Sequence, residues 1–263
     1  MWPDTLMWKA WIPNGLSLGN LSFGFLAIVV ASHASTSTKI SSDNIYLISG
    51  MLILIAALFD GLDGPMARML NVQSTLGEQL DSLGDLTTFG LAPGFLMYKM
   101  YLADFRFAFE NMGSQIEIPL GMIVAVIYPI CAAYRLARFN VTHDTNSFVG
   151  LPSPIAGVFI ALIAISFQSY PLSRWLAISI FLLMAFLMVS NIRYTKPQVS
   201  LKSHFTYFRL ILFSAVIVLS MVFLGWYWVI FSVIMLYIFS GFIALGLELV
   251  QKVKWAHHHE DKP

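Results

Sequence analysis

Long runs without any charged residue recur along this chain and constrain its fold more than any other feature. Ile45–Phe59 and Leu86–Tyr98 contain no charge at all. Across the 263 residues, 58% are hydrophobic and 11% are charged, whereas soluble domains carry about 25% charged residues. Such runs are typical of helices that cross a bilayer. We therefore predict an all-α, polytopic transmembrane helical bundle.

The apolar runs predict eight membrane spans, because one spanning helix needs about 20 mostly apolar residues. The predicted spans are Ile12–Ala31, Ile45–Leu70, Gly77–Leu102, Ile116–Phe139, Pro154–Tyr170, Trp175–Ile192, Tyr207–Leu224 and Tyr227–Val250. The last two would form a tight hairpin around Gly225 and Trp226.

The distribution of basic residues predicts how the chain is oriented, since eight spans place both termini on one side. The amino-terminal side would hold eleven of them: Lys9, Arg68, Arg135, Arg138, Arg193, Lys196, Lys202, Arg209, Lys252, Lys254 and Lys262. The opposite side would hold four: Lys39, Lys99, Arg106 and Arg174. Cytoplasmic loops carry the excess of Lys and Arg. We expect both termini to face the cytoplasm, in the cell membrane.

Several classes of partner and modification are disfavoured by composition. The formal net charge is +1 and no basic run occurs, so we expect no nucleic-acid binding. A single cysteine, Cys131, excludes an internal disulfide. The first apolar run passes into polar sequence at His33–Asn44 without a small-x-small cleavage site, so we expect no cleavable signal peptide. We interpret His257–His259 as a solvated tail, with metal binding as the alternative.

Four aspartates gather at the end of the second predicted span and the start of the third, and acids at the edge of a membrane helix mark functional sites. Asp60 and Asp63 lie three residues apart, and Asp81 and Asp85 lie four apart. Each pair therefore shares one helix face. A short turn between the two spans brings these faces together, so the four carboxylates should converge at the membrane surface.

Four carboxylates cannot all stay ionised in contact without compensating positive charge, and Arg68 alone is insufficient. Hard oxygen ligands favour Mg²⁺ or Mn²⁺, and a pair of such ions suits displacement at phosphorus. Gly64 and Ala67 leave room on the same face for a ligand. Two alternatives remain: acids neutralised by lysines or arginines for helix packing, and a pathway for cations as in a membrane cation transporter. We interpret Glu78 as an acid favoured in the first turn of a helix.

The spacing of these residues resembles a known signature. From Asp60 to Asp85 the chain follows the pattern D-x-x-D-G-x-x-A-R-x8-G-x3-D-x3-D, with every fixed position present. This is similar to the signature of the CDP-alcohol phosphatidyltransferases. The resemblance implies a six-helix catalytic core in a domain spanning 1–200. The chain departs from the short family members at 201–263, where its apolar runs predict a helical hairpin and a cytoplasmic tail.

The resemblance also implies roles for individual residues. The ligands of two divalent cations would be Asp60, Asp63, Asp81 and Asp85, and Asp85 would also act as the general base. The CDP moiety would be bordered by Gly64, Ala67, Arg68 and Gly77. Asn20 would face the nucleotide, although an Asn in a span can instead hydrogen-bond a neighbouring helix.

Three further stretches are similar to the CDP-diacylglycerol–serine phosphatidyltransferases of the Gram-positive and archaeal membrane type. They are Arg135–Asn140, Phe148–Pro154 and Met188–Tyr194. The resemblance implies CDP-diacylglycerol or CDP-archaeol as donor, L-serine as acceptor and a homodimer. Arg135 and Arg138, three apart, would grip the acceptor carboxylate or the lipid-side phosphate, or else snorkel to the interface. Choline, glycerol phosphate and inositol phosphate remain alternative acceptors.

Overall fold

The computed structural model describes residues 4–35, 42–111, 114–142, 147–167, 171–195 and 225–260. These residues are almost entirely helical. The helical elements are α1 (Asp4–Ser32), η1 (His33–Ser35), α2 (Ser42–Met69), α3 (Thr75–Asp85), η2 (Leu86–Leu91), α4 (Ala92–Met97), η3 (Tyr98–Leu102), α5 (Leu120–Thr142), α6 (Ser153–Ser166), α7 (Arg174–Val189) and α10 (Trp226–Glu260). Two short antiparallel pairs join β1 (Phe107–Asn111) to β2 (Ser114–Ile118) and β3 (Ser147–Val149) to β4 (Arg193–Thr195).

Long apolar helices confirm the predicted fold class. Within the described residues, four helical stretches are long and apolar enough to cross a membrane: Trp8–Ser32, Asn44–Met69, Leu120–Val141 and Trp226–Ile243. The helices α6 and α7 are apolar but shorter. The protein is therefore an integral membrane protein built as a helical bundle.

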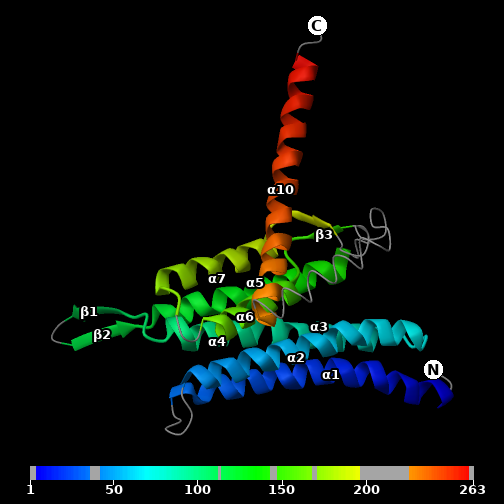
Figure 1. The fold of residues 1–263 in the computed structure, drawn as a ribbon, viewed down its shortest axis with the longest axis horizontal. Helices are drawn as coiled ribbons and strands as arrows, with labels where there is room; N and C mark the ends of the chain where they lie inside the picture. Colours follow the sequence, from blue (N-terminus) through cyan, green and yellow to red (C-terminus); the bar gives the residue numbers. More distant parts are fainter. Residues whose placement is uncertain are drawn as a thin grey trace.

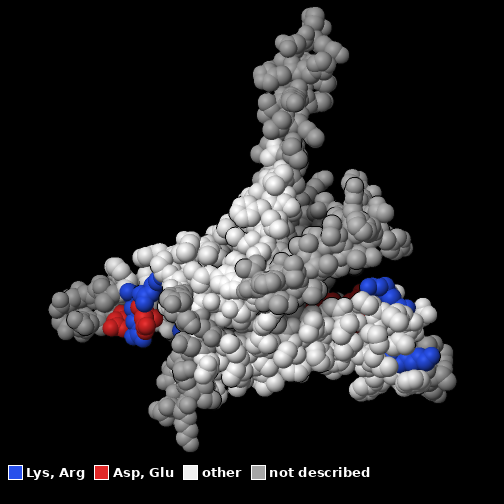
Figure 2. Space-filling model, in the orientation of Figure 1, with Lys and Arg blue, Asp and Glu red and all other residues white. Residues whose placement is uncertain are grey.

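Most of the helices share one direction (Figure 1). The helices α1 and α2 lie side by side, with α3 against them and with α5, α6 and α7 beyond. The β1–β2 hairpin lies at one end of this bundle, and the amino terminus and the start of α3 lie at the other. Among the described residues on the face shown in Figure 2, most of the charged side chains lie towards these two ends. This distribution is the one expected of a bundle whose middle lies in lipid.

The predicted third span is a continuous helical path from Thr75 to Leu102 that contains two π-helical segments, η2 and η3. The first of these begins directly after Asp85. The Thr88 hydroxyl, inside η2, donates to the backbone carbonyl of Asn20 at 2.9 Å and ties this segment to α1. Such π segments are frequent at functional sites, and this one adjoins the acidic cluster.

The predicted fourth span begins too early. Instead of entering a helix at Ile116, the chain completes the β1–β2 hairpin and α5 begins at Leu120. Alternating polar and apolar residues favour a strand here, and Arg106 and Glu117 form an ion pair at 2.8 Å next to the hairpin. Pro119 then precedes the first helical residue, a position where its missing N–H is harmless.

Two other predicted boundaries differ. The helix α6, which corresponds to the predicted fifth span, ends at Ser166 and not at Tyr170. The helix α7, which corresponds to the predicted sixth span, ends at Val189 and not at Ile192. The chain turns out of α7 because β4 pairs with β3, where Phe148 lies opposite Tyr194.

The carboxyl-terminal region is described only from residue 225, so the predicted seventh span at Tyr207–Leu224 lies outside the described residues. The predicted eighth span corresponds to α10, which begins at Trp226 and runs steeply across the direction of the other helices (Figure 1). Ring stacking holds its first half on the bundle, with centroids 4.8 Å apart for Phe159 and Phe231 and 5.4 Å for Tyr194 and Tyr237.

A tight turn between α2 and α3 creates the functional end of the bundle. Asn71 has a φ of 55°, a left-handed conformation that asparagine tolerates better than most residues. Ser74 then caps α3, because its Oγ accepts a hydrogen bond from the Gly77 backbone N–H at 3.1 Å. The turn reverses the chain, so the end of α2 faces the start of α3.

Candidate active site

The turn brings three of the four predicted aspartates into one cluster. Asp60 and Asp63 come from α2, and Asp81 comes from α3. Each offers a carboxylate oxygen, and these three oxygens lie within 4.8 Å of one another. Helix periodicity places the α2 pair on one face, and the register set by the turn aligns that face with Asp81.

Asp85 completes the group from one helical turn further along α3. It lies close enough to Asp60 for the charges of the two carboxyl groups to influence each other, and it is only 8% exposed. Its Oδ1 atom is buried and has no hydrogen-bond partner among the described residues. A buried acceptor without a donor is unfavourable unless something else satisfies it.

The donor set fits a divalent cation of the hard type. All four groups offer oxygen, which Mg²⁺ and Mn²⁺ prefer. The charge of Arg135 acts on both Asp60 and Asp85, and Arg68 lies beside Asp63 and Asp81, but two arginines do not balance four carboxylates. A cation bound to the cluster would satisfy the Asp85 oxygen that has no hydrogen-bond partner within the ranges that the structure describes. The acidic cluster could therefore bind metal.

Two polar residues of α1 support the cluster from behind. The Ser17 hydroxyl donates to Asp63 Oδ2 at 2.6 Å, and the Asn20 amide donates to Asp60 Oδ1 at 3.3 Å. Both side chains are buried, with Asn20 fully so. Each therefore orients a carboxylate. Sequence reasoning singled out Asn20 for the nucleotide and assigned Ser17 no role, although polar residues three apart in an apolar helix are a usable signal.

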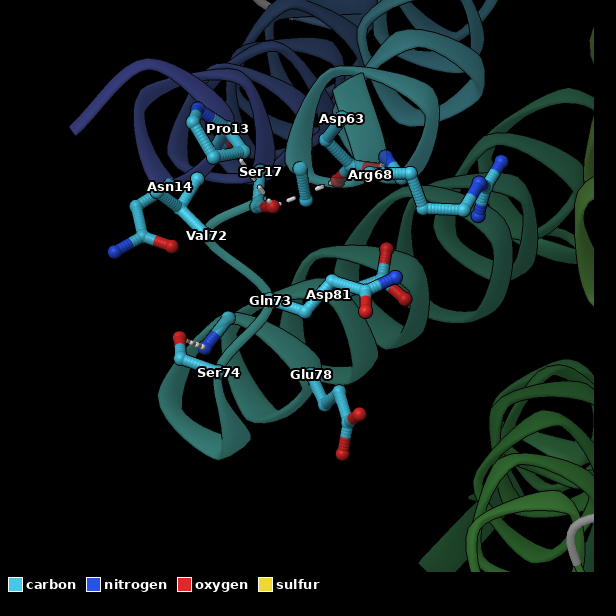
Figure 3. A pocket seen from close by; sticks show the side chains of 13 residues that line it. Pro13, Asn14, Ser17, Asp63, Arg68, Val72, Gln73, Ser74, Glu78 and Asp81 are labelled. Carbon is cyan, nitrogen blue, oxygen red and sulfur yellow. Dashed lines mark hydrogen bonds between the residues drawn. The ribbon is translucent and has the colours of Figure 1, made fainter. Parts of the chain in front are cut away.

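A cavity of about 250 Å³ opens on the α1 side of the acids (Figure 3). All four residues predicted to border the CDP moiety line it: Gly64, Ala67, Arg68 and Gly77. Asn20 is not among its lining residues, whereas Asn14 and Gln73, which sequence reasoning missed, are. The cavity thus gathers the small residues of the signature beside Asp63 and Asp81.

The small residues are needed for space. A Cβ added at Gly77 would lie 3.2 Å from Asn14 Oδ1 and 3.3 Å from Ser74 Oγ. A Cβ at Gly64 would lie 3.4 Å from the Arg68 guanidinium. Larger side chains at Gly64 or Gly77 would therefore fill the cavity or displace the residues that shape it.

A second cavity, of about 360 Å³, lies on the other side of the acids, between α3, α5 and the start of α6. Asp85 and Arg135 line this cavity, while Asp81 and Glu78 line both cavities. The Asn140 amide, also in the lining, donates to Ser82 Oγ at 2.9 Å and joins α5 to α3. Asp81 thus borders both cavities, with Asp63 in the lining of the first and Asp85 in that of the second, and we call these three residues the acidic wall.

The two arginines that the sequence grouped are separated by the structure. Arg135 is 7% exposed, donates to Ser153 Oγ at 2.7 Å and lines the second cavity. Arg138 is not in that lining. Its guanidinium donates to four backbone carbonyls, from Val149, Met188, Val189 and Ser190, at 2.6 to 3.2 Å.

These bonds of Arg138 join α5 to the end of α7 and to β3. Gly150, next to Val149, has a φ of 82°, and an added Cβ there would lie 2.6 Å from the Arg138 guanidinium. The contacts favour a structural role for Arg138. Its predicted binding of acceptor or lipid phosphate remains an untested prediction.

Comparison with known proteins extends this picture. A sequence profile described as CDP-alcohol phosphatidyltransferase matches residues 10–192. A CDP-diacylglycerol–serine O-phosphatidyltransferase of Helicobacter pylori is 33% identical over 69% of this chain and 70% of its own length. Proteins of the same name from Bacillus subtilis and Methanocaldococcus jannaschii are each 35% identical, over 70% and 58% of this chain and 89% and 66% of their own lengths.

Proposed function

The chain belongs to the CDP-alcohol phosphatidyltransferase family, and from this premise we propose that it makes phosphatidylserine. In the proposed reaction the L-serine hydroxyl attacks the phosphorus that carries the lipid in CDP-diacylglycerol. A new serine oxygen–phosphorus bond forms, the bond to the CMP oxygen breaks, and CMP leaves. The observation that carries the proposal is the acidic wall shared by two cavities, which gives each substrate its own side.

The first cavity suits the nucleotide. Its signature residues Gly64, Ala67 and Gly77 leave room for a flat ligand, and the Arg68 guanidinium adds a positive charge. Asn14 and Gln73 supply amide groups that can hydrogen-bond a base or a sugar. We propose that CMP occupies this cavity before and after transfer, with the lipid phosphate at the acidic wall. Asn20 would act from behind the wall, through Asp60.

The second cavity suits the acceptor. Arg135 offers a buried guanidinium that matches a carboxylate. Asp85 lines the same cavity, and we propose it as the general base that accepts the proton of the attacking hydroxyl. The names of the relatives support L-serine over other alcohols.

We propose that Asp60, Asp63, Asp81 and Asp85 hold two divalent cations, Mg²⁺ or Mn²⁺. When bound, such ions stabilise negative charge on the attacking and leaving oxygens. Ser17 and Asn20 fix the orientation of Asp63 and Asp60, so the carboxylates are arranged before substrate arrives.

The remaining parts of the proposal concern the setting of the enzyme. The excess of basic residues on the amino-terminal side supports an active site and both termini at the cytoplasmic face of the cell membrane. The donor would be CDP-diacylglycerol or its archaeal ether counterpart, CDP-archaeol, and a homodimer is proposed from the family resemblance. We propose residues 1–200 as the catalytic domain, a division that agrees with the profile match at 10–192.

The test is CMP release by the purified protein with CDP-diacylglycerol and Mn²⁺. Serine, choline, glycerol 3-phosphate and inositol phosphate are compared as acceptors. We expect serine-dependent release with phosphatidylserine as product. Release with another acceptor alone would overturn the serine assignment and keep the chemistry. No release with any acceptor, from either the ester or the ether donor, would contradict the proposal and favour cation transport, for which metal flux into vesicles is the assay.

A further inference from the structure

The second cavity contains a cation and a carboxylate that the proposed chemistry does not use together. Arg135 comes from α5 and is 7% exposed. Glu78 comes from the first turn of α3, is exposed, and lines this cavity as well as the first. In Figure 3 the Glu78 side chain points away from Ser17 and Asp63. The carboxylate is thus directed away from the supporting contacts of α1.

The formal charges in the lining of the second cavity single out Arg135 and Glu78. The four aspartates carry four negative charges, which two divalent cations would balance. Arg135 and Glu78 are then the formal charges left in the lining of the second cavity. Within the described part of the chain, no hydrogen bond or ion pair engages the Glu78 carboxylate. A carboxylate without a cationic partner in the lining of a substrate cavity is available to a cationic group of the ligand.

We infer that Glu78 is a specificity-determining residue that binds the ammonium group of the acceptor while Arg135 binds its carboxylate. The second cavity would therefore select a zwitterionic hydroxy amino acid. This inference rests on the proposed function and names how the acceptor is recognised.

The other acceptors fit the pair less well. A phosphorylated acceptor carries up to two negative charges, so Glu78 would repel it and Arg135 would be the one cation of the lining to oppose it. Choline has no carboxylate for Arg135 to bind. Serine satisfies both charges and presents its hydroxyl to Asp85 on the same cavity wall.

A purely structural role would also place an acid at this position. Acids in the first turn of a helix interact favourably with the helix dipole, and Glu78 lies in the first turn of α3. That role predicts a loss of stability that is independent of the acceptor. Recognition of an ammonium group predicts an effect that vanishes when the acceptor has no ammonium group.

The test compares L-serine with 3-hydroxypropanoate, which lacks the amino group, in the full-length enzyme with CDP-diacylglycerol and Mn²⁺. For Glu78→Gln we expect KM for serine to rise about 10-fold, the size of a lost charge-assisted hydrogen bond, with kcat nearly unchanged. The kcat/KM for 3-hydroxypropanoate should stay constant or rise. Glu78→Asp should restore part of the serine affinity. Glu117→Gln, an exposed carboxylate beside the distant hairpin, is the matched control and should change neither value.

A second variant adds a positive charge at the neighbouring position. Gln79 lines the same cavity and is exposed, so Gln79→Lys should raise KM for serine and lower it for 3-hydroxypropanoate. Saturation-transfer NMR of the two ligands provides a binding readout without turnover. Equal effects of Glu78→Gln on both acceptors, or no effect on serine, would overturn the inference alone. A wild-type enzyme that releases no CMP with serine would overturn the proposed function and this inference with it.

Discussion

The two cavities on either side of the acidic wall are built in different ways. Most of the nucleotide-side cavity comes from one stretch of chain, the end of α2, the turn and the start of α3, closed by Pro13, Asn14 and Ser17 of α1. The acceptor-side cavity combines α3 with the end of α5 and the residues that open α6. The first depends on small residues and a tight turn, and the second on charged side chains brought together by packing.

This difference suggests how one reaction type can serve many acceptors. A cavity formed within a short stretch can keep its shape whatever the distant helices carry, so the nucleotide and the acidic wall stay fixed. A cavity formed by packing can change its charge through single substitutions on α5 or α3 without disturbing the wall. We therefore expect variants of the wall to lose all activity and variants of the acceptor side to change affinity.

Substitutions in the acidic wall should reduce catalytic activity more than any other. Asp81→Asn and Asp85→Asn each remove one charge from the shared cluster, and Asp85→Asn also removes the proposed base. We expect each to reduce kcat by about 1,000-fold or more, because removal of one electrostatic contributor to a transition state costs a factor of this order. CMP release by the purified variants measures it. Near-wild-type turnover in a folded Asp81→Asn protein would remove the acidic cluster from the mechanism.

A metal titration accompanies this experiment. Activity after removal of divalent cations by chelation should return on addition of Mn²⁺ or Mg²⁺. The wild-type protein should bind the ions more tightly than Asp81→Asn in calorimetry, because the cluster loses an oxygen ligand.

Loss of the hydrogen bond that α1 makes to the acidic cluster should reduce activity by an intermediate amount. Ser17→Ala removes the 2.6 Å hydrogen bond to Asp63 while leaving the ligand itself in place. We expect kcat/KM to fall about 10-fold, in keeping with a hydrogen bond to a charged group. Ser17→Thr retains the hydroxyl and is the matched control. A loss of equal size in Ser17→Thr would indicate that packing in α1, and not the hydroxyl, is responsible.

The smallest effect on catalysis should come from Arg138. Its guanidinium is engaged with the carbonyls of Val149, Met188, Val189 and Ser190, so Arg138→Ala should loosen the junction of α5, β3 and α7. We expect a lower midpoint of thermal inactivation, with KM for serine in the folded enzyme changed less than in Arg135→Ala. Arg174→Ala, an exposed arginine at the start of α7, is the control. A raised KM with unchanged thermal inactivation would restore Arg138 to the acceptor site.

The same contrast explains how far the sequence could predict this molecule. The spacing from Asp60 to Asp85 is local, so helix periodicity and one turn are enough to predict the acidic cluster, and the structure brings three of its members within 4.8 Å. The Asp63–Ser17 contact depends on how α1 and α2 are aligned along their lengths, and no local pattern records that alignment.

Two features of the structure could not be read from local patterns. Arg135 and Arg138 are three apart on one helix, yet β3 and the end of α7 contact Arg138, while the predicted ligand role of both arginines stays a prediction. The predicted fourth span included part of the hairpin before α5, because Ile116 and Ile118 are apolar. In the structure these two residues belong to β2, which pairs with β1. Tertiary contacts decided both cases.

The most direct test of the account is a pair of KM measurements for both substrates in two variants, Gly77→Val and Arg135→Lys. Gly77→Val places bulk where an added Cβ already meets Asn14 and Ser74, and Arg135→Lys replaces a planar fork with a point charge in the second cavity. The account predicts that Gly77→Val raises KM for CDP-diacylglycerol alone and Arg135→Lys raises KM for serine alone. If both variants raised KM for the same substrate, the assignment of one substrate to each side of the acidic wall would be wrong.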